Sequence, residues 1–523
     1  MINKEKIFLI LVFLVSLILR LYRPNYPPLL WDEASLGYNA YSILKTGRDE
    51  HGSFLPFIFK SFGDYKPGLY VYLAIPFVAT LGLNEFAVRL PSILAGSLTP
   101  VILYLLIKSF FSKSSKIAPI AAVLICISPY NIHFSRGAWE TNILTFELVL
   151  FIYLLHRQKL LLASLVFAST FYTYQAGKII SLLLLLIYLT SHRPPLKPLL
   201  SKFFLPIIFL LLPFSYRLVF SPDTNRLNVV SLFSYPRSTT ESQQLLAESN
   251  SLNYSLLHNQ VFHFGKQFFL RYFNHFSTRF LVFEGDWQVG RHSAPYIGVL
   301  LYPSLVFLII GLIFTNYRLQ ITQFFAIWLF LSPIPSALTR DIIQPVRIMS
   351  FSIPLVYFIA SGLQLFLNKF SSPVIRYSLF IVYLLSFLYY SDLYYQHLIK
   401  KSPTDTLFGY QQAVKYAIDH PKTTVYFTPF YGQPYVYYLF YSQYPPQKYQ
   451  PKANLSLTGY DVGTITNIDN IYFQTPDFSQ IRHQPSVLAI FSYDETIRQN
   501  IDPNLLTPIS PINHISTFYA YQN

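Results

Sequence analysis

The feature that most constrains this chain is a series of long apolar runs that recurs through its first 391 residues. Only 12% of the 523 residues are charged, whereas a typical soluble domain carries about 25%. In lipid, backbone polar groups must be satisfied within the segment, so an apolar run of about 20 residues crosses as a helix. The sequence therefore predicts an all-α polytopic membrane bundle.

Eleven apolar runs are interpreted as transmembrane helices, several of them shorter than the usual 20 residues. They are residues 6–22, 86–110, 117–134, 142–155, 160–174, 178–191, 200–220, 296–315, 320–338, 346–368 and 375–391. The first run resembles the core of a signal peptide, but no small-residue cleavage site follows it. We therefore expect it to remain as the first transmembrane helix.

The basic residues decide whether a further run, Gly68–Leu83, crosses the membrane. If it does not, the segments on the inner side carry thirteen basic residues and one acid, Glu5, as the positive-inside rule expects. The thirteen are Lys4, Lys6, Lys108, Lys113, Lys116, Arg157, Lys159, Arg193, Lys197, Lys202, Arg318, Lys369 and Arg376. This distribution predicts a cell-membrane protein with a cytoplasmic N-terminus, and it places Gly68–Leu83 at the outer interface or packed without crossing.

The remaining polar segments then gather on the outer face. We expect residues 1–391 to form a transmembrane domain with two large outer loops, 23–85 and 221–295, and residues 392–523 to form a small extracytoplasmic α/β domain. Within that domain, Tyr410–His420 is typical of an amphipathic helix, and Thr424–Phe427 and Val487–Phe491 are typical of buried strands.

The net charge of +15 does not indicate a nucleic-acid partner, because much of the excess lies in short loops that orient membrane helices. The one cysteine, Cys126, lies inside an apolar run, so no intrachain disulfide can form. We see no glycine-rich phosphate loop and no Cys/His metal cluster of recognisable spacing.

Two adjacent acids, Asp32 and Glu33, follow the first helix by about ten residues. Carboxylates near a bilayer are costly unless they have a partner or a chemical role, which makes this pair a candidate catalytic site. The alternative is structural: Asp32 would cap a helix that starts at Glu33. On a helix the two side chains point about 100° apart, so we expect them to have different roles.

A second motif places Lys66 just before the apolar run Gly68–Leu83, with Asp64 two residues earlier. Lys66 is either a snorkelling lysine or a cation for a phosphate at headgroup depth. In a third motif Arg89 enters the membrane beside a proline, where it could instead pair with Glu85 at the start of a helix.

Further positive charges lie at outer helix ends, against the positive-inside bias, and this indicates a bound anion. They are Arg136, Arg291 and Arg347, with Glu140 and His292 as neighbouring candidate supporting groups. We expect Lys66 to face one cavity at the outer membrane boundary together with at least two of Arg89, Arg136, Arg291 and Arg347.

The order of Asp32-Glu33, Tyr65-Lys66-Pro67-Gly68 and Glu85-Phe86-Ala87-Val88-Arg89-Leu90-Pro91-Ser92 resembles the dolichyl-phosphate-mannose–protein mannosyltransferase family of the GT-C superfamily, and especially its bacterial aminoarabinose-transferase-like branch. The resemblance covers about residues 10–160 and weakens beyond them. It implies a membrane enzyme that takes a sugar from a polyprenyl-phosphate donor on the outer face, with inversion.

By this resemblance Asp32 is the catalytic base, with Glu33 as a supporting acid, and Lys66 lies near the donor phosphate. The aminoarabinose transferase of lipid A, which belongs to this branch, has Glu-Lys-Pro-Pro where this chain has Tyr65-Lys66-Pro67-Gly68. Because this chain lacks that glutamate, no metal-binding role is carried over to it. No nucleotide cofactor is needed, and a divalent metal is not excluded. The acceptor would be a hydroxyl of a lipid, a protein or a polysaccharide. The alternatives are a transporter or flippase of lipid-linked sugars, and a non-catalytic glycan-binding membrane protein.

Overall fold

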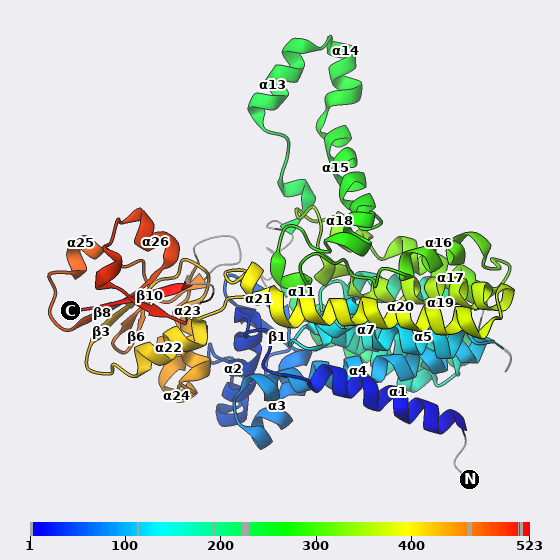
Figure 1. Ribbon diagram of the computed structural model, residues 1–523, viewed down its shortest axis with the longest axis horizontal. Helices are drawn as coiled ribbons and strands as arrows, with labels where there is room; N and C mark the ends of the chain where they lie inside the picture. Colours follow the sequence, from blue (N-terminus) through cyan, green and yellow to red (C-terminus); the bar gives the residue numbers. More distant parts are fainter. Residues whose placement is uncertain are drawn as a thin grey trace. The chain divides into compact units, whose positions relative to one another are not determined.

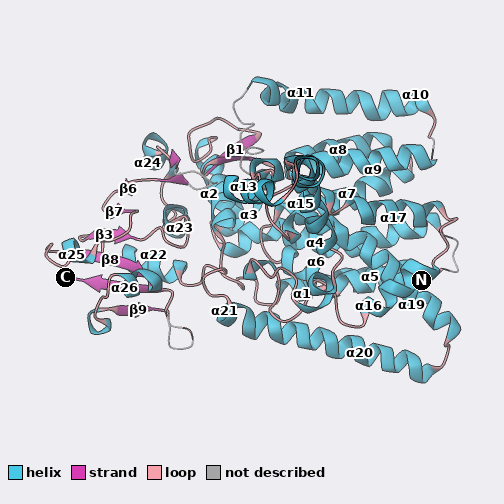
Figure 2. Cartoon of the chain, turned by 90° about the horizontal axis from the view of Figure 1, so that it is seen from above, coloured by secondary structure: helices cyan, strands magenta, loops and turns pink. Residues whose placement is uncertain are grey.

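The computed structural model describes residues 4–111, 115–192, 194–220, 230–457, 463–510, 512 and 516–523. The chain forms two compact units, each built from several separate segments. The first, here called the bundle unit, comprises Met1–Arg20, Leu94–Ser135 and Glu140–Leu393. The second, the sheet unit, comprises Leu21–Ile93, Arg136–Trp139 and Tyr394–Asn523. The ten strands of the described residues all belong to the sheet unit (Figure 2).

The bundle unit consists of helices, most of which run in a common direction (Figure 1). Its principal helices are α1 (Lys4–Leu21), α4 (Glu85–Phe110, shared with the sheet unit), α5 (Ile117–Cys126), α6 (Pro129–Ser135), α7 (Glu140–His156), α8 (Leu160–Thr173), α9 (Gly177–His192), α10 (Leu196–Leu199), α11 (Leu205–Phe220), α16 (Ser304–Phe314), α17 (Gln320–Leu331), α18 (Ile334–Ala337), α19 (Ser352–Lys369) and α20 (Pro373–Asp392). Shorter helical turns are Leu200–Phe204, Leu232–Ser234, Arg279–Phe283, Gly290–His292 and Pro345–Phe351.

Each of the eleven runs interpreted as transmembrane contains a helix in the structure. Among the described residues, four helical stretches are long and apolar enough to cross a membrane: Glu85–Phe110, Leu196–Ser215, Pro345–Lys369 and Pro373–Lys401. A fifth crossing is available if the bent pair α5 and α6 acts as one span. The structure therefore has several apolar helices, and the count of eleven crossings stays a prediction.

Proline accounts for the places where helices are shorter than the sequence predicted. The run 117–134 bends by 52° between α5 and α6, at Pro129. The run 296–315 becomes helical only at Ser304, after Pro303, and the run 320–338 breaks between Leu331 and Ile334, around Pro333. Proline lacks the amide hydrogen that would continue the helix and clashes with the preceding turn.

Two glycines allow α16 and α19 to pack with their backbones in contact. A Cβ atom on Gly311 would lie 1.9 Å from the carbonyl oxygen of Phe358, and one on Gly362 would lie 2.0 Å from that of Phe307. Both distances are far inside van der Waals contact. Small residues at such crossings are a common means of association between membrane helices, where close packing replaces the hydrophobic effect.

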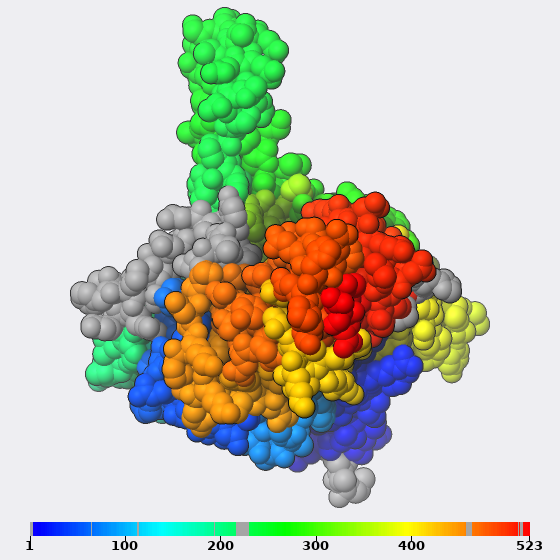
Figure 3. Space-filling model, turned by 90° about the vertical axis from the view of Figure 1, so that its left-hand side faces the viewer, coloured from blue at the N-terminus to red at the C-terminus, as the bar shows by residue number. Residues whose placement is uncertain are grey.

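One segment of the bundle unit projects away from its other helices (Figures 1 and 3). This segment, here called the arm, comprises α13 (Thr239–Glu248), α14 (Ser251–Asn253), a π-helical turn (Tyr254–His258) and α15 (Gln260–Asn274). At 1.5 Å per residue, the 15 residues of α15 form a helix about 23 Å long. The arm lies in the predicted outer loop 221–295, of which residues 221–229 fall outside the described part of the chain.

The sheet unit combines the first loop with the C-terminal residues. Its first-loop elements are α2 (Trp31–Thr46), the antiparallel pair β1 (Ile58–Ser61) and β2 (Asp64–Pro67), and α3 (Leu69–Leu81). With 13 residues, α3 is about 20 Å long, shorter than the roughly 30 Å of a hydrocarbon core. This length agrees with the prediction that Gly68–Leu83 does not cross the membrane, which stays a prediction.

The C-terminal part contains a six-stranded sheet in the order β6-β7-β3-β8-β10-β9. The strands are β3 (Thr424–Phe427), β6 (Asn467–Ile468), β7 (Ile471–Tyr472), β8 (Val487–Ser492), β9 (Thr507–Ile509) and β10 (Phe518–Gln522), and a separate pair is β4 (Ser456–Leu457) with β5 (Gly463–Thr464). The helices are α21 (Leu398–Lys401), α22 (Tyr410–Ile418), α23 (Pro434–Tyr441), α24 (Pro446–Tyr449), α25 (Phe478–Ile481) and α26 (Tyr493–Arg498), with helical turns at Leu393–His397, Gln450–Lys452 and Pro503–Leu505.

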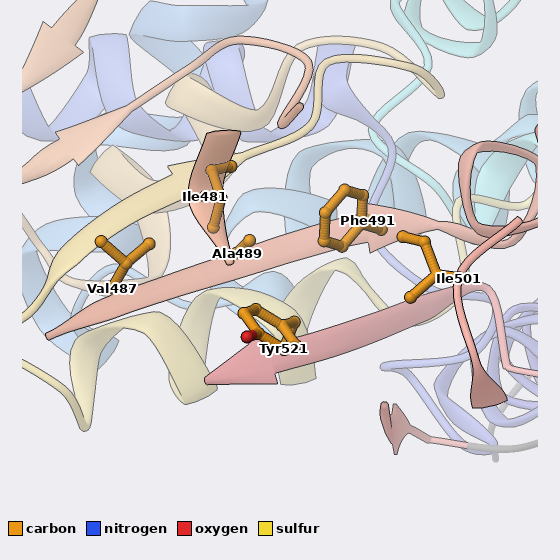
Figure 4. Packing of buried hydrophobic residues seen from close by; sticks show 6 residues of the cluster. All are labelled: Ile481, Val487, Ala489, Phe491, Ile501 and Tyr521. Carbon is orange, nitrogen blue, oxygen red and sulfur yellow. The ribbon is translucent and has the colours of Figure 1, made fainter. Parts of the chain in front are cut away.

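Both strands predicted from the sequence are present, and β8 is buried along its whole length. Side chains alternate across a strand, so Val487, Ala489 and Phe491 share one face and pack with Ile481 and Tyr521 (Figure 4). The strand is therefore central, with covered faces on both sides. The domain boundary expected after residue 391 stays a prediction, because compactness does not show which residues lie in water.

Candidate functional site

Helix α2 begins at Trp31, so both acids of the first motif lie in its first turn. The backbone amide of Leu30 donates to Glu33 Oε2 at 3.0 Å, which makes Glu33 the residue that reaches back to cap the helix. The alternative in which Asp32 caps a helix starting at Glu33 is therefore wrong. The positive end of the helix dipole favours both carboxylates at this position.

Asp32 instead faces Lys66, with which it forms an ion pair. Lys66 reaches this position because it lies on β2, paired with Phe59 of β1, and its ammonium also lies 5.5 Å from the centre of the Phe62 ring. The Asp32 side chain is 29% exposed and that of Lys66 is 17% exposed. A carboxylate and an ammonium are thus held together where solutes can reach them.

Glu33 points elsewhere and is buried with Arg89. The Arg89 guanidinium donates from Nε to Oε1 at 2.9 Å and from Nη2 to Oε2 at 2.8 Å, a bidentate pair. The backbone amide of Ala138 also donates to Oε1, at 2.6 Å, so that with the Leu30 amide the carboxylate accepts four hydrogen bonds. Arg89 also donates to the carbonyls of Pro24 and Pro28, at 3.0 and 3.3 Å. This network joins the start of α2, the start of α4 and the preceding loop.

Arg136 is fully buried in the same unit. Its Nη2 donates to the carbonyls of Arg23 and Tyr26, at 2.7 and 3.1 Å, and its guanidinium lies 5.0 and 5.6 Å from the ring centres of Tyr395 and Tyr394. The contacts of Arg89 and Arg136 favour a structural role over the donor-phosphate role expected for them. Of the three cations predicted in this unit, Lys66 is the one that is partly exposed.

In the bundle unit, Arg291 and His292 lie in a short helical turn. His292 Nδ1 lies 2.7 Å from Asp286 Oδ2, and both side chains are buried. Burial lowers the pKa of His292, although the hydrogen bond to Asp286 opposes this shift. The carbonyl of Arg291 lies 2.9 Å from Nε2 of His133. Asp286 was not predicted, because nothing in the sequence around it distinguishes it from other loop acids.

Arg347, also in the bundle unit, pairs with Asp341 and donates to the Thr339 hydroxyl, both at 2.5 Å. Its side chain is mostly buried. Glu140 is half-buried as the first residue of α7. Asp64 begins β2, and its side chain is outside the described part of the structure. The prediction that Arg291 and Arg347 share a cavity with Lys66 stays a prediction.

A further buried acid, Glu50, follows α2 in the sheet unit. Asn39 Nδ2 donates to Glu50 Oε1 at 3.0 Å, and the Glu50 amide donates back to Asn39 Oδ1 at 3.0 Å. Burial raises the pKa of Glu50 to about 8 and lowers the pKa of the neighbouring His51 to about 4. The sequence offered no signal for this pair. No group of three His, Cys, Asp or Glu within the described ranges is arranged to hold a metal ion.

Comparisons with known proteins give one family profile match and several similar solved structures. Residues 66–220 match the family profile described as dolichyl-phosphate-mannose-protein mannosyltransferase. A search of curated proteins finds no match. Crystal structures of ArnT from Cupriavidus metallidurans, in the apo state and bound to undecaprenyl phosphate, align with TM-scores of 0.53 and 0.55 at 14% and 12% identity. Each alignment covers 99% of this chain and 98% of ArnT.

The archaeal oligosaccharyltransferase AglB from Archaeoglobus fulgidus, in complex with an inhibitory peptide and a dolichol phosphate, aligns with a TM-score of 0.49 at 12% identity. That alignment covers 84% of this chain and 64% of AglB. The likeness to ArnT extends over nearly the whole chain, and the profile match begins at Lys66 of the second motif. The profile covers residues 66–220, less than a third of the chain, and the likeness to ArnT shows that this chain has the fold of that protein.

Proposed function

We propose that the protein is a membrane glycosyltransferase that moves a sugar from a polyprenyl-phosphate donor to a hydroxyl acceptor on the outer face of the membrane. The family match, the ArnT-like fold and the crystal structure of ArnT bound to undecaprenyl phosphate support this function. The observation that carries it is the partly exposed Asp32–Lys66 pair at the first turn of α2.

In the proposed reaction, the acceptor oxygen attacks the anomeric carbon while the bond from that carbon to the phosphate oxygen breaks. Asp32 accepts the proton of the hydroxyl, and polyprenyl phosphate leaves with the bonding electrons. Lys66 stabilises the negative charge that develops on the departing phosphate. Single displacement of this kind inverts the anomeric centre, as the family resemblance implies.

The ion pair suggests the order in which Lys66 and Asp32 act during the reaction. An adjacent ammonium favours the charged form of a carboxylate and makes it a weaker base. A donor phosphate competes for the Lys66 ammonium, and its arrival leaves Asp32 to act on the acceptor. Glu33 and Arg89 do not take part in this step in the proposal; they hold the first turn of α2, and therefore Asp32, in place.

The proposed topology has eleven crossings, a cytoplasmic N-terminus and an extracytoplasmic C-terminal region. Asn454 lies in that region, between α24 and β4. In a Cys126→Ser background, Asn454→Cys should react with an impermeant thiol reagent in intact cells. Reaction only after the membrane is broken would contradict this orientation without bearing on the chemistry.

The function is tested with purified protein in liposomes that contain a labelled polyprenyl-phosphate sugar and a mixture of candidate hydroxyl acceptors. We expect release of free polyprenyl phosphate together with a labelled acceptor, and loss of both with Asp32→Asn. A protein that moved the labelled lipid between leaflets without releasing polyprenyl phosphate would be a transporter, and the proposal would fail. The sugar, hexose or pentose, and the natural acceptor would follow from the glycan that is missing in cells without the protein.

A further inference from the structure

The arm carries large apolar side chains that nothing in the described structure covers. In α15, Val261 is 81% exposed, Phe262 48%, Phe269 57% and Phe273 61%. Toward the tip, Leu246, Leu252, Leu256 and Leu257 are also exposed. An apolar patch of this size is rare on a surface that faces water and usually marks an interaction site.

Three of the five phenylalanines of α15 form one stripe. Phe262, Phe269 and Phe273 are separated by seven and four residues, which places them within about 40° of one another on a helix. Lys266, four residues after Phe262, lies at the edge of the same face and is exposed. Arg271 lies nine residues after Phe262, about 180° away on the helix, and is buried. The helix is therefore amphipathic, with its apolar face turned outward from the bundle unit.

Hydrogen bonds fix the base of α15 to two other segments of the bundle unit. Arg271 donates from Nε and Nη2 to the carbonyl of Arg340, at 3.3 and 3.0 Å. The Tyr272 hydroxyl donates to the carbonyl of Phe330, at 2.7 Å, in the last turn of α17. These bonds tie the helix to the end of α17 and to the loop that follows α18.

The direction of α15 differs from that of the long helices of its unit. In Figure 1 it stands upright, whereas α19 and α20 lie nearly horizontal below it, and in Figure 2 it is viewed almost along its own axis. The stretches that contain α19 and α20 are long and apolar enough to cross a bilayer. With these helices across the bilayer, α15 would lie parallel to the membrane plane. Its base at the end of α17 places it near the boundary between hydrocarbon and headgroups.

We propose that the arm rests in the lipid interface, with the phenylalanine stripe of α15 buried among the upper acyl chains and Lys266 at the level of the phosphates. Helices that lie in this plane bury aromatic and leucine side chains to a depth of about 5–10 Å and keep lysines at the polar boundary. Phenylalanines along the helix and a lysine at the edge of the stripe match that environment. The proposal rests on the protein being a membrane protein and does not depend on its transferase activity.

The test uses spin labels on single cysteines in the full-length protein in liposomes, with Cys126 replaced by serine. Labels at Phe269→Cys and Phe273→Cys should be relaxed mainly by oxygen, which concentrates in lipid, and little by a water-soluble nickel chelate. Gln411→Cys on α22 is the matched helical control, because its side chain is exposed and polar, and we expect it to respond to the nickel chelate. If Cys126→Ser fails to fold, the parent protein serves as background, since Cys126 is buried.

Two results would overturn the proposal. Nickel accessibility at position 269 equal to that at position 411 would place the stripe in water. Spectral broadening between labels at 269 that disappears on dilution with unlabelled protein would place a second copy of the chain on this face. Retained transferase activity in either case would leave the proposed function intact.

Discussion

Two acid–base pairs start from neighbouring residues of α2 and differ in almost every physical respect. Asp32 and Lys66 are partly exposed, and an ion pair joins them. Glu33 and Arg89 are buried and are joined by two hydrogen bonds, and further backbone groups satisfy both side chains. The same classes of charged side chain thus serve two purposes within one helical turn.

The difference between the two pairs shows how a charged pair that can act on a substrate is distinguished from one that stabilises the fold. Desolvating a charge costs several kcal/mol, and the buried pair tolerates this cost because nearly every polar atom has a partner. A pair arranged in that way has no capacity left for a substrate. The exposed pair leaves room for a phosphate or a hydroxyl to replace one partner, and this is what a catalytic site requires.

The largest expected effect belongs to the exposed pair. Asp32→Asn keeps the shape of the side chain but removes its basicity, so turnover with saturating donor should fall about 10²–10⁴-fold. Donor binding and thermal stability should change little, because exposed pairs contribute about 0–1 kcal/mol to stability. Asp419→Asn, an exposed acid after α22, serves as the control. Near-normal turnover in Asp32→Asn would exclude this residue as the base and direct attention to Asp64 or Glu140.

The buried pair should show the opposite pattern. Arg89→Met leaves the Glu33 carboxylate buried without its cation, and losing one partner of a buried pair typically costs about 3–5 kcal/mol. The thermal midpoint in detergent should fall clearly, and Arg89→Met combined with Glu33→Gln should lose less than the sum of the two single variants. A donor Michaelis constant that rises while stability stays unchanged would instead support the phosphate-binding role that the sequence predicts for Arg89.

Lys66→Ala tests the cation of the exposed pair. A hydrogen bond to a charged group contributes about 1.5–3 kcal/mol, so the donor KM should rise about 10- to 150-fold. Lys66→Arg should recover part of this loss, and Lys452→Ala, which affects an exposed pair with Asp469, should leave KM unchanged. An unchanged KM in Lys66→Ala would show that Lys66 does not contact the donor.

Glu50 extends the comparison to a buried acid without a paired arginine. Its pKa is raised to about 8, chiefly by burial and also by Asp49, while the Asn39 hydrogen bond and Lys60 oppose the shift. Between about pH 4.5 and 8 the folded protein keeps a proton that the unfolded chain has lost, so stability falls as pH rises, by at most about 1.4 kcal/mol per pH unit.

The check is to measure thermal midpoints of the parent protein and Glu50→Gln at pH 5.5 and 8.5. Glu50→Gln should lose less stability over this range than the parent does. Equal pH dependence in the two proteins would contradict a buried, protonated Glu50.

The sequence predicted the helical runs and the divergence of the Asp32 and Glu33 side chains because both follow from local geometry. Apolar runs form helices in lipid, and adjacent residues on a helix diverge by about 100°. The sequence did not predict where the arginines point. The predicted topology places Arg89 and Arg136 at outer helix ends, a position that led to the prediction of anion binding. The anion that Arg89 meets is Glu33 of the same chain, and Arg136 meets carbonyls and tyrosine rings.

Contacts of long sequence separation were beyond prediction for a similar reason. The Tyr441 hydroxyl donates to Glu85 Oε1 at 2.7 Å, and Gln450 Nε2 donates to the Ser42 hydroxyl at 3.1 Å. Tyrosine and glutamine are common throughout the C-terminal region, and composition does not indicate which of them meets the first loop. The runs 117–134, 296–315 and 320–338 are less continuously helical than predicted for a different reason, because their apolar composition continues through prolines at which the helix bends, begins late or breaks.

Hydrogen bonds between the first loop and the C-terminal region constrain when the sheet unit can form during synthesis. The Tyr437 hydroxyl of α23 donates to the carbonyl of Leu29, two residues before α2, at 2.9 Å and across 408 residues of chain. Tyr38 of α2 donates likewise to the carbonyl of Tyr444, at 3.0 Å. At about 5–20 residues per second, a ribosome needs about 20–80 seconds to travel between these partners. The contacts that the C-terminal region makes with the first loop therefore form only after the last part of the chain is synthesised. A nascent or truncated chain contains Asp32 but lacks these contacts around α2.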